Sequence, residues 1–92
     1  MPTYVMFGKY TPDSIEDISA QRTQDATKVI GDAGGKVVSG YALLGETDLV
    51  VIAEFPNNEQ AMKASVGLAR LLEISFTTSP AVSMDEFDQL VG

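Results

Sequence analysis

Residues 36–55 constrain the fold of this chain more than any other stretch. Two apolar runs rich in β-branched residues, 36–44 and 49–55, flank the sequence Gly-Glu-Thr-Asp, whose residues favour turns. Two such runs separated by a short turn segment are typical of a β-hairpin. Because the segment contains no Asn-Gly or Asp-Gly pair, we expect a four-residue loop with Gly45 at a positive φ.

The segments before the hairpin predict a strand followed by a helix. Residues 3–10 alternate aromatic, β-branched and small side chains and end before a proline, which cannot donate a hydrogen bond to a strand ladder. Asp13 or Ser14 is the expected N-cap, and apolar residues then recur at helical spacing until the glycine pair at Gly34. The predicted buried stripe of this helix consists of Ile15, Ile18, Ala26, Val29, Ile30 and Ala33.

The segments after the hairpin predict a helix, a strand and a short C-terminal helix. The Pro-Asn-Asn sequence at 56–58 ends the preceding strand and caps the helix, in which Gly67 indicates a close approach of another element. Residues 73–79 predict a strand that ends at Pro80, and residues 84–91 suffice for two helical turns. The predicted buried stripe of the longer helix consists of Ala61, Met62, Ser65, Leu68, Ala69 and Leu72.

This order of elements predicts one α+β domain over residues 1–92. The β-α-β-β-α-β order favours a ferredoxin-like fold, with a four-stranded antiparallel sheet, two helices on one face and a short C-terminal helix. Residues 49–53 are apolar on both strand faces, which is typical of a sheet covered on both sides. Since two helices cover only one face, the other is an exposed apolar patch or an interface. We predict a homodimer in which the open sheet faces of two copies pack together.

Composition excludes several classes of function. The net charge of −7, from six Lys or Arg and thirteen Asp or Glu, disfavours nucleic acid and anionic membranes as partners. Cysteine and histidine are absent, so thiol chemistry, the commonest general base and the commonest metal ligand are all missing. We therefore expect no cofactor and no metal. Without a basic leader or an apolar run of roughly 18 residues, a cytoplasmic protein is predicted.

Few residues remain as candidates for chemistry or binding. Glu54 ends an apolar strand and could serve as a base, and Tyr41 could orient a ligand through its hydroxyl, so these two are the catalytic candidates. The candidates for a ligand pocket are Tyr10, Arg22 and Asp48. For all five the sequence favours a structural role: tyrosines in the core or an interface, carboxylates at strand ends and turns, and an arginine that reaches solvent along an apolar surface.

Four motifs along the chain together resemble the GYD domain family. They are Pro2-Thr-Tyr-Val-Met-Phe-Gly-Lys-Tyr-Thr-Pro, Gly34-Gly-Lys-Val, Gly45-Glu-Thr-Asp and Met84-Asp-Glu-Phe. The resemblance covers essentially the whole chain and implies a dimeric α+β barrel of bacterial or archaeal type, without an assigned reaction. Gly45 and Asp48 stand where the glycine and aspartate of the family signature fall, and Thr47 stands at the place of its tyrosine.

Three functions from different classes remain open. The first is a non-enzymatic homodimeric module that binds a small apolar or aromatic molecule, or a partner protein, between helices and sheet. The second is a cofactor-independent oxygenase or isomerase that uses tyrosine and Glu54 as acid and base. The third is a structural assembly subunit that exchanges the helix at 84–91 between protomers. An apolar pocket of a few hundred Å³ on which tyrosine and Glu54 converge favours the first two, and solid packing favours the third.

Overall fold

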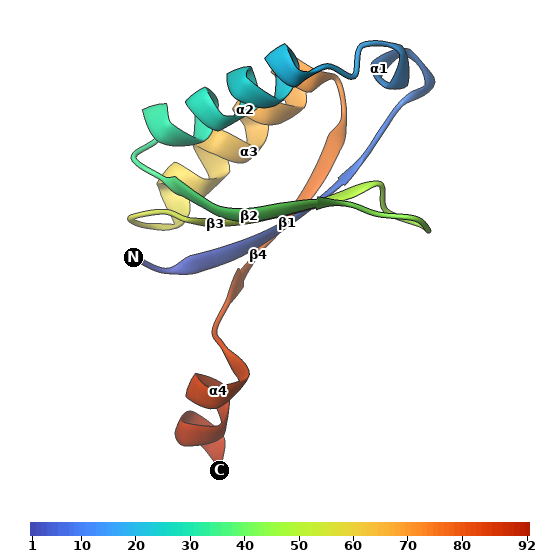
Figure 1. Ribbon diagram of the computed structural model, residues 1–92. Coiled ribbons are helices and arrows are strands. Elements are labelled where there is room, and N and C mark those ends of the chain that lie inside the picture. The colour runs from blue at the N-terminus through green and yellow to red at the C-terminus, as the bar shows by residue number, and fades with distance from the viewer.

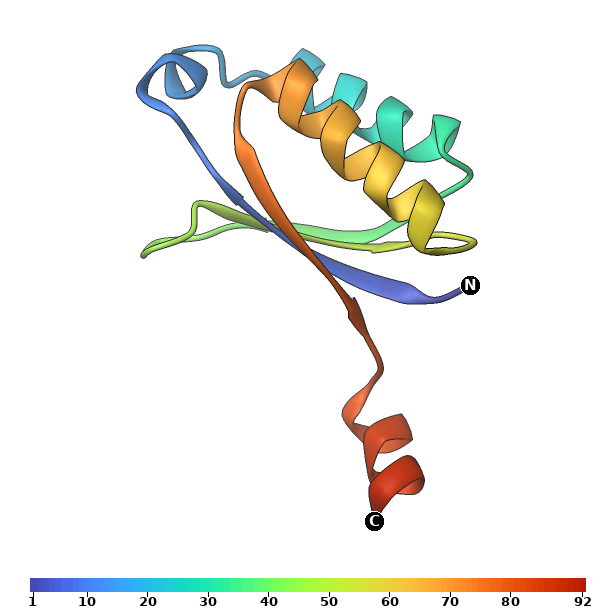
Figure 2. The same ribbon diagram turned by 180° about the vertical axis from the view of Figure 1, so that it is seen from behind.

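A computed structural model describes all 92 residues of the chain. The four strands form one antiparallel sheet in the order β2-β3-β1-β4, and α2 and α3 cover one of its faces (Figures 1 and 2). This arrangement is the predicted ferredoxin-like topology. In chain order the elements are β1 (Thr3–Lys9), α1 (Pro12–Glu16), α2 (Ala20–Asp32), β2 (Lys36–Ala42), β3 (Leu49–Glu54), α3 (Asn58–Leu72), β4 (Ser75–Ala81) and α4 (Met84–Val91).

The hairpin of β2 and β3 forms as predicted, but its loop is longer than the expected four residues: six residues, 43–48, connect the two strands. Its register pairs Lys36 with Glu54 and Ala42 with Leu49, with a bulge near the start of β2. Gly45 lies in the connecting loop with φ of 143°, a value that favours glycine, which confirms the prediction for this position. The hairpin extends the sheet on one side of β1, and β4 extends it on the other side.

The first helical segment consists of two helices, so the prediction of one helix starting at Asp13 or Ser14 is wrong. Thr11 is the N-cap of α1: its hydroxyl accepts a hydrogen bond from the Ser14 amide at 3.1 Å, and the Ser14 hydroxyl accepts one from the Thr11 amide at 2.8 Å. Ser19 then caps α2 by accepting a hydrogen bond from the Arg22 amide at 3.1 Å. Each cap starts its own helix, and the chain turns between them.

Three residues assigned to the buried stripes are exposed. Ile15 and Ile18 are 53% and 57% exposed, because the break at residues 17–19 separates their positions from the helical phase of α2. Met62 is 68% exposed although its neighbour Ala61 is buried. One residue turns a helix by about 100°, so only one of these two neighbours faces the sheet.

The last strand lies two residues further along the chain than predicted. Glu73, the expected first residue of the strand, is instead the C-cap of α3 and adopts a left-handed conformation with φ of 56°. Pro80 does not end the strand but lies within it, opposite Tyr4. Because β4 is an edge strand, a residue without an N–H group is tolerated there. Three polar residues on one face of the strand are exposed: Ser75, Thr77 and Ser79.

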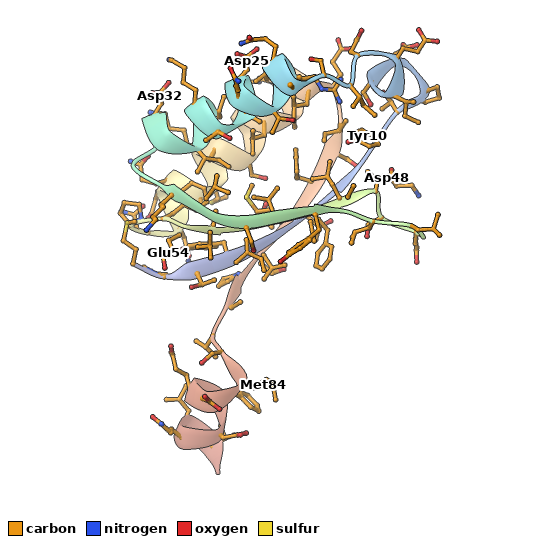
Figure 3. All side chains as sticks on the ribbon, viewed as in Figure 1. Tyr10, Asp25, Asp32, Asp48, Glu54 and Met84 are labelled. Carbon is orange, nitrogen blue, oxygen red and sulfur yellow. The ribbon has the colours of Figure 1, made fainter.

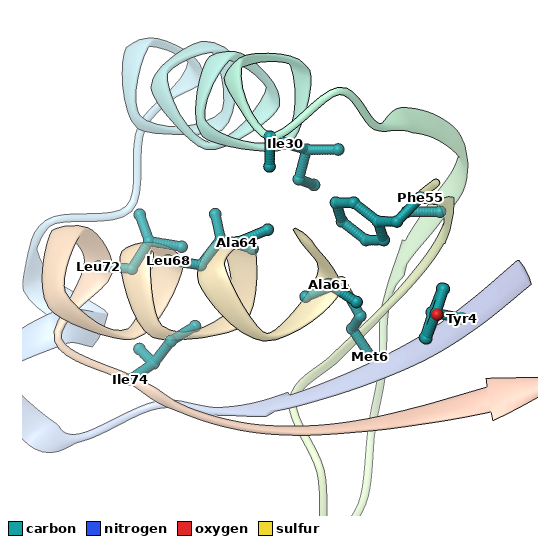
Figure 4. Packing of buried hydrophobic residues seen from close by; sticks show 11 residues of the cluster. Tyr4, Met6, Ile30, Phe55, Ala61, Ala64, Leu68, Leu72 and Ile74 are labelled. Atoms are coloured by element: carbon teal, nitrogen blue, oxygen red, sulfur yellow. The ribbon is translucent and has the colours of Figure 1, made fainter. Parts of the chain in front are cut away.

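A hydrophobic core lies between the two long helices and the sheet (Figure 4). The ring of Phe55, which is 0% exposed, meets the ring of Tyr4 edge-on with centroids 5.6 Å apart. The Tyr4 hydroxyl donates to Asn58 Oδ1 at 2.5 Å, so its polar atom is satisfied. A Cβ on Gly67 would lie 3.1 Å from Val29 Cγ1, which confirms the close approach predicted there.

Gly35→Ala is expected to lower the free energy of unfolding by about 2 kcal/mol, within the usual range for overpacking. A Cβ at this position would stand 2.6 Å from the Phe55 ring and 2.8 Å from the Glu54 carbonyl oxygen. The ring is fully buried and the oxygen belongs to a central strand, so neither moves aside freely. Urea unfolding at fixed protein concentration measures the effect.

The matched control is Gly31→Ala, in the last turn of α2. No atom lies within 4 Å of the added Cβ, so this variant is expected to be more stable than the wild type by up to about 1 kcal/mol. A Gly35→Ala variant as stable as the wild type would contradict the packing of the α2–β2 turn on Phe55.

Candidate ligand-binding site

A cleft of about 410 Å³ lies between α2 and the helix-facing side of β2 and β3. Small side chains leave this space open: strand alternation directs Gly40 and Ala42 of β2 towards the helices, and Ala26 of α2 lies across from them. Leu68 of α3 and Phe76 of β4 also line it. Thirteen of its eighteen lining residues are hydrophobic, so the cleft suits the apolar body of a small molecule.

Tyr10 and Arg22 form the polar end of the cleft. The guanidinium carbon of Arg22, in the first turn of α2, lies 5.8 Å from the centroid of the Tyr10 ring, within the range of a cation–π contact. Its Nη1 atom donates to the Ser14 carbonyl oxygen at 2.7 Å. The structure thus brings together two of the three residues that were predicted for a ligand pocket, and both are half-buried.

Asp48, the third of these residues, does not line the cleft but hydrogen-bonds to the backbone of Tyr10, which does. Its Oδ2 accepts a hydrogen bond from the Tyr10 amide at 2.8 Å. Its own amide donates to the Gly8 carbonyl oxygen at 2.9 Å, and its carbonyl oxygen accepts from the Leu43 amide at 2.8 Å. Asp48 therefore fastens the β2–β3 loop to the end of β1 and positions the Tyr10 backbone.

The two catalytic candidates do not come together. Glu54 is the last residue of β3 and pairs with Lys36, at the opposite end of the sheet from Tyr10 and Asp48 (Figure 3). Because side chains alternate between the two faces along β3, the Glu54 side chain points away from the helices. Tyr41 borders the cleft from the edge strand, and 62% of it is exposed. No acid–base pair converges in the cleft.

A second hollow of about 390 Å³ lies between α3 and β4. None of the side chains around it is charged. Its polar groups bond to each other: Tyr4 donates to Asn58, and the hydroxyl oxygens of Ser65 and Thr78 are 2.9 Å apart. This hollow therefore offers fewer free polar groups for recognition than the cleft beside α2.

The sheet face opposite the helices and the C-terminal helix both present apolar side chains. Strand alternation places Val5, Phe7, Val50 and Ile52 on this open face, and it places Ser75, Thr77 and Ser79 of the edge strand β4 beside them. α4 stands away from the body on the same side of the sheet (Figures 1 and 2), and no helix of the chain, α4 included, is long and apolar enough to span a bilayer. The apolar residues of α4 are all exposed: Met84, Phe87, Leu90 and Val91.

The small residues that create the cleft were not singled out from the sequence. Gly40 and Ala42 lie on one parity of a predicted strand, and Ala26 lies on the predicted buried stripe of a helix. Small residues on both surfaces that face each other are the signal that could have indicated an unfilled space. Reading that signal requires knowing which strand lies under which helix.

The β-α-β-β-α-β order, with both long helices on one sheet face, defines a ferredoxin-like α+β domain. The chain belongs to the GYD domain family, whose sequence model matches residues 4–91. It is also similar to the crystal structure of the Mycobacterium tuberculosis leucine response regulatory protein, with a TM-score of 0.60 and 10% sequence identity over 90% of this chain. The match spans 51% of that chain, and at this identity the likeness shows a shared fold. No curated protein matches the chain.

Proposed function

We propose that this chain is a non-enzymatic module that binds a small, largely apolar molecule in the cleft between α2 and the sheet. The observation that carries the proposal is the cleft itself, whose volume of about 410 Å³ lies in the range typical of small-molecule sites. An unfilled apolar space costs a small domain packing contacts that it needs for stability. A binding role gives a reason for keeping Gly40, Ala42 and Ala26 small.

The arrangement of polar groups favours binding over catalysis. Glu54 lies on the open side of the sheet, and Tyr41 is largely exposed at the edge strand. A reaction by general acid–base catalysis needs a positioned proton donor or acceptor within hydrogen-bond reach of the substrate. The cleft contains no carboxylate for that role. A subunit with a purely structural role is less favoured, because the space between helices and sheet is not filled.

Gly40→Phe is expected to weaken binding of the neutral fluorophore N-phenyl-1-naphthylamine by at least about tenfold, since its aromatic ring would occupy the cleft. A Cβ at Gly40 makes ordinary contacts of 3.7 Å and 4.0 Å, so the backbone of β2 accommodates a side chain at this position. The emission of this probe rises in apolar surroundings, and a fluorescence titration measures its affinity.

Gly40→Ala is the matched control for this experiment, because it adds one methyl group and leaves most of the cleft open. We expect it to bind the probe nearly as well as the wild type. Urea unfolding curves establish that both variants are folded. If folded Gly40→Phe bound the probe as tightly as the wild type, the cleft would not be the binding site and the proposal would be rejected.

We further propose that two copies associate through their open sheet faces. Two apolar surfaces of one chain lack a partner within it: the face that carries Val5 and Ile52, and the helix α4. A second copy related by a twofold axis offers a partner to both surfaces at once, with each α4 against the other protomer. Large exposed apolar patches are uncommon in monomers, which supports this interface.

A further inference from the structure

We propose that the ligand of the cleft is a small organic monocarboxylate with an apolar body, and that Arg22 binds its carboxylate. This inference rests on the proposed function, because it names the chemical class of molecule that the same cleft takes. The apolar lining between α2 and the sheet holds the body of the ligand. The Arg22 guanidinium at the polar end of the cleft binds the charged head group of the ligand.

The charge distribution around the cleft is the first observation behind this inference. The chain carries thirteen acidic and six basic residues, yet Arg22 is the one charged residue among those that line the cleft. No carboxylate of the chain lies within salt-bridge distance of Arg22, whereas Lys28 pairs with Asp32 at 3.1 Å. In so acidic a chain, a half-buried arginine without a carboxylate partner leaves a positive charge available to a ligand.

The geometry of Arg22 is the second observation. The hydrogen bond to the Ser14 carbonyl oxygen and the contact with the Tyr10 ring hold the guanidinium at the polar end of the cleft. A side chain that is already held loses less conformational entropy when a ligand binds. Arginine has five N–H donors in a planar fork, of which the bond to Ser14 uses one, and this fork matches the two oxygens of a carboxylate.

The hydroxyl groups along α2 are the third observation, because they are already engaged. Thr23 donates to the Ser19 carbonyl oxygen at 3.3 Å, and Thr27 donates to the Thr23 carbonyl oxygen at 3.0 Å. The Ser19 hydroxyl, which caps the helix, accepts a hydrogen bond from the Arg22 amide. Strand alternation turns the Tyr41 side chain to the other sheet face, so the polar groups left for a ligand are the Arg22 guanidinium and the Tyr10 hydroxyl, which makes no hydrogen bond within the chain.

A single cation favours a monoanion over a phosphate ester. A phosphate monoester carries nearly two negative charges at neutral pH and is usually bound by several donors or by clustered arginines. The cleft offers one guanidinium, and the net charge of −7 repels dianions more strongly than monoanions. A carboxylate fits the charge that the site supplies.

Displacement of N-phenyl-1-naphthylamine by octanoate and by octanamide tests this inference. The two competitors share the same apolar chain and differ in the charge of the head group at neutral pH. We expect octanoate to displace the probe from the wild-type protein at about tenfold lower concentration than octanamide, the effect of a charge-assisted hydrogen bond. Arg22→Gln should abolish this preference, and Arg22→Lys should retain part of it.

Arg70→Gln is the matched control, because it makes the same change of net charge on the exposed last turn of α3, away from the cleft. It is expected to leave the preference for octanoate unchanged. For each variant the measured quantity is the ratio of the octanoate and octanamide concentrations that displace the probe. A change in the stability of the variant affects both concentrations and does not imitate the expected effect. Equal displacement by both competitors in the wild type, or an unchanged ratio in Arg22→Gln, would overturn the carboxylate inference while leaving the proposed binding function intact. Failure of the probe to bind the wild type at all would reject both.

Discussion

Phe55→Ala is expected to lower the free energy of unfolding by about 3–5 kcal/mol, the usual range for truncating a buried phenylalanine. The ring is 0% exposed and lies between the Tyr4 ring and the α2–β2 turn at Gly35. Its removal leaves a cavity where three elements meet. The free energy of unfolding of a domain is only about 5–15 kcal/mol, so this single substitution removes a large part of it.

Urea unfolding followed by circular dichroism measures the loss, at one protein concentration because association would shift the midpoint. Leu44→Ala is the control: it also truncates a large apolar side chain, but Leu44 is fully exposed in the hairpin loop, and little change is expected. A loss below about 1 kcal/mol for Phe55→Ala would mean that the ring is not part of a close-packed core.

Val5→Lys is expected to convert the proposed dimer into a monomer, with the dimer dissociation constant raised at least about hundredfold. Val5 lies opposite Ile52 at the centre of the open face. A lysine there would bury an unpaired charge in the interface, and the twofold symmetry of a dimer would introduce it twice. Sedimentation equilibrium at micromolar concentration reports the molecular mass directly.

Val66→Lys is the matched control for the interface. Val66 lies on α3 and is 50% exposed, on the side of the sheet opposite the proposed interface, so the same substitution is expected to leave the dimer intact. A wild-type protein that sediments as a monomer at micromolar concentration would contradict the proposed interface. So would equal dimer affinities for Val5→Lys and the wild type.

The topology of this domain follows from local sequence signals that agree with one another. The hairpin around Gly45 joins two strand-helix-strand halves, and the right-handed crossover rule leaves few ways to arrange them. The Gly34 turn, with φ of 75°, ends the first long helix where the glycine pair predicted it. Each of these signals depends on a few neighbouring residues, which is why the sequence alone suffices to predict them.

Features that depend on tertiary context were predicted less well. A serine such as Ser19 caps a helix only if the preceding chain turns away, and the spacing of Ile15 and Ile18 fits a continuous helix equally well. Pro80 is compatible with a strand only at the edge of the sheet, and the sequence does not state which strand is the edge. The cleft likewise depends on which small residues of β2 face Ala26. The prediction of a cytoplasmic location remains a prediction.

A ¹H–¹⁵N correlation spectrum recorded during titration with N-phenyl-1-naphthylamine tests the central claim most directly, because it locates the ligand residue by residue. If the cleft binds small apolar molecules, the largest shift changes will fall on the amides of Gly40, Ala42, Ala26 and Thr23, which line it. Changes confined to the open sheet face or to α4, with the cleft amides unmoved, would contradict the claim.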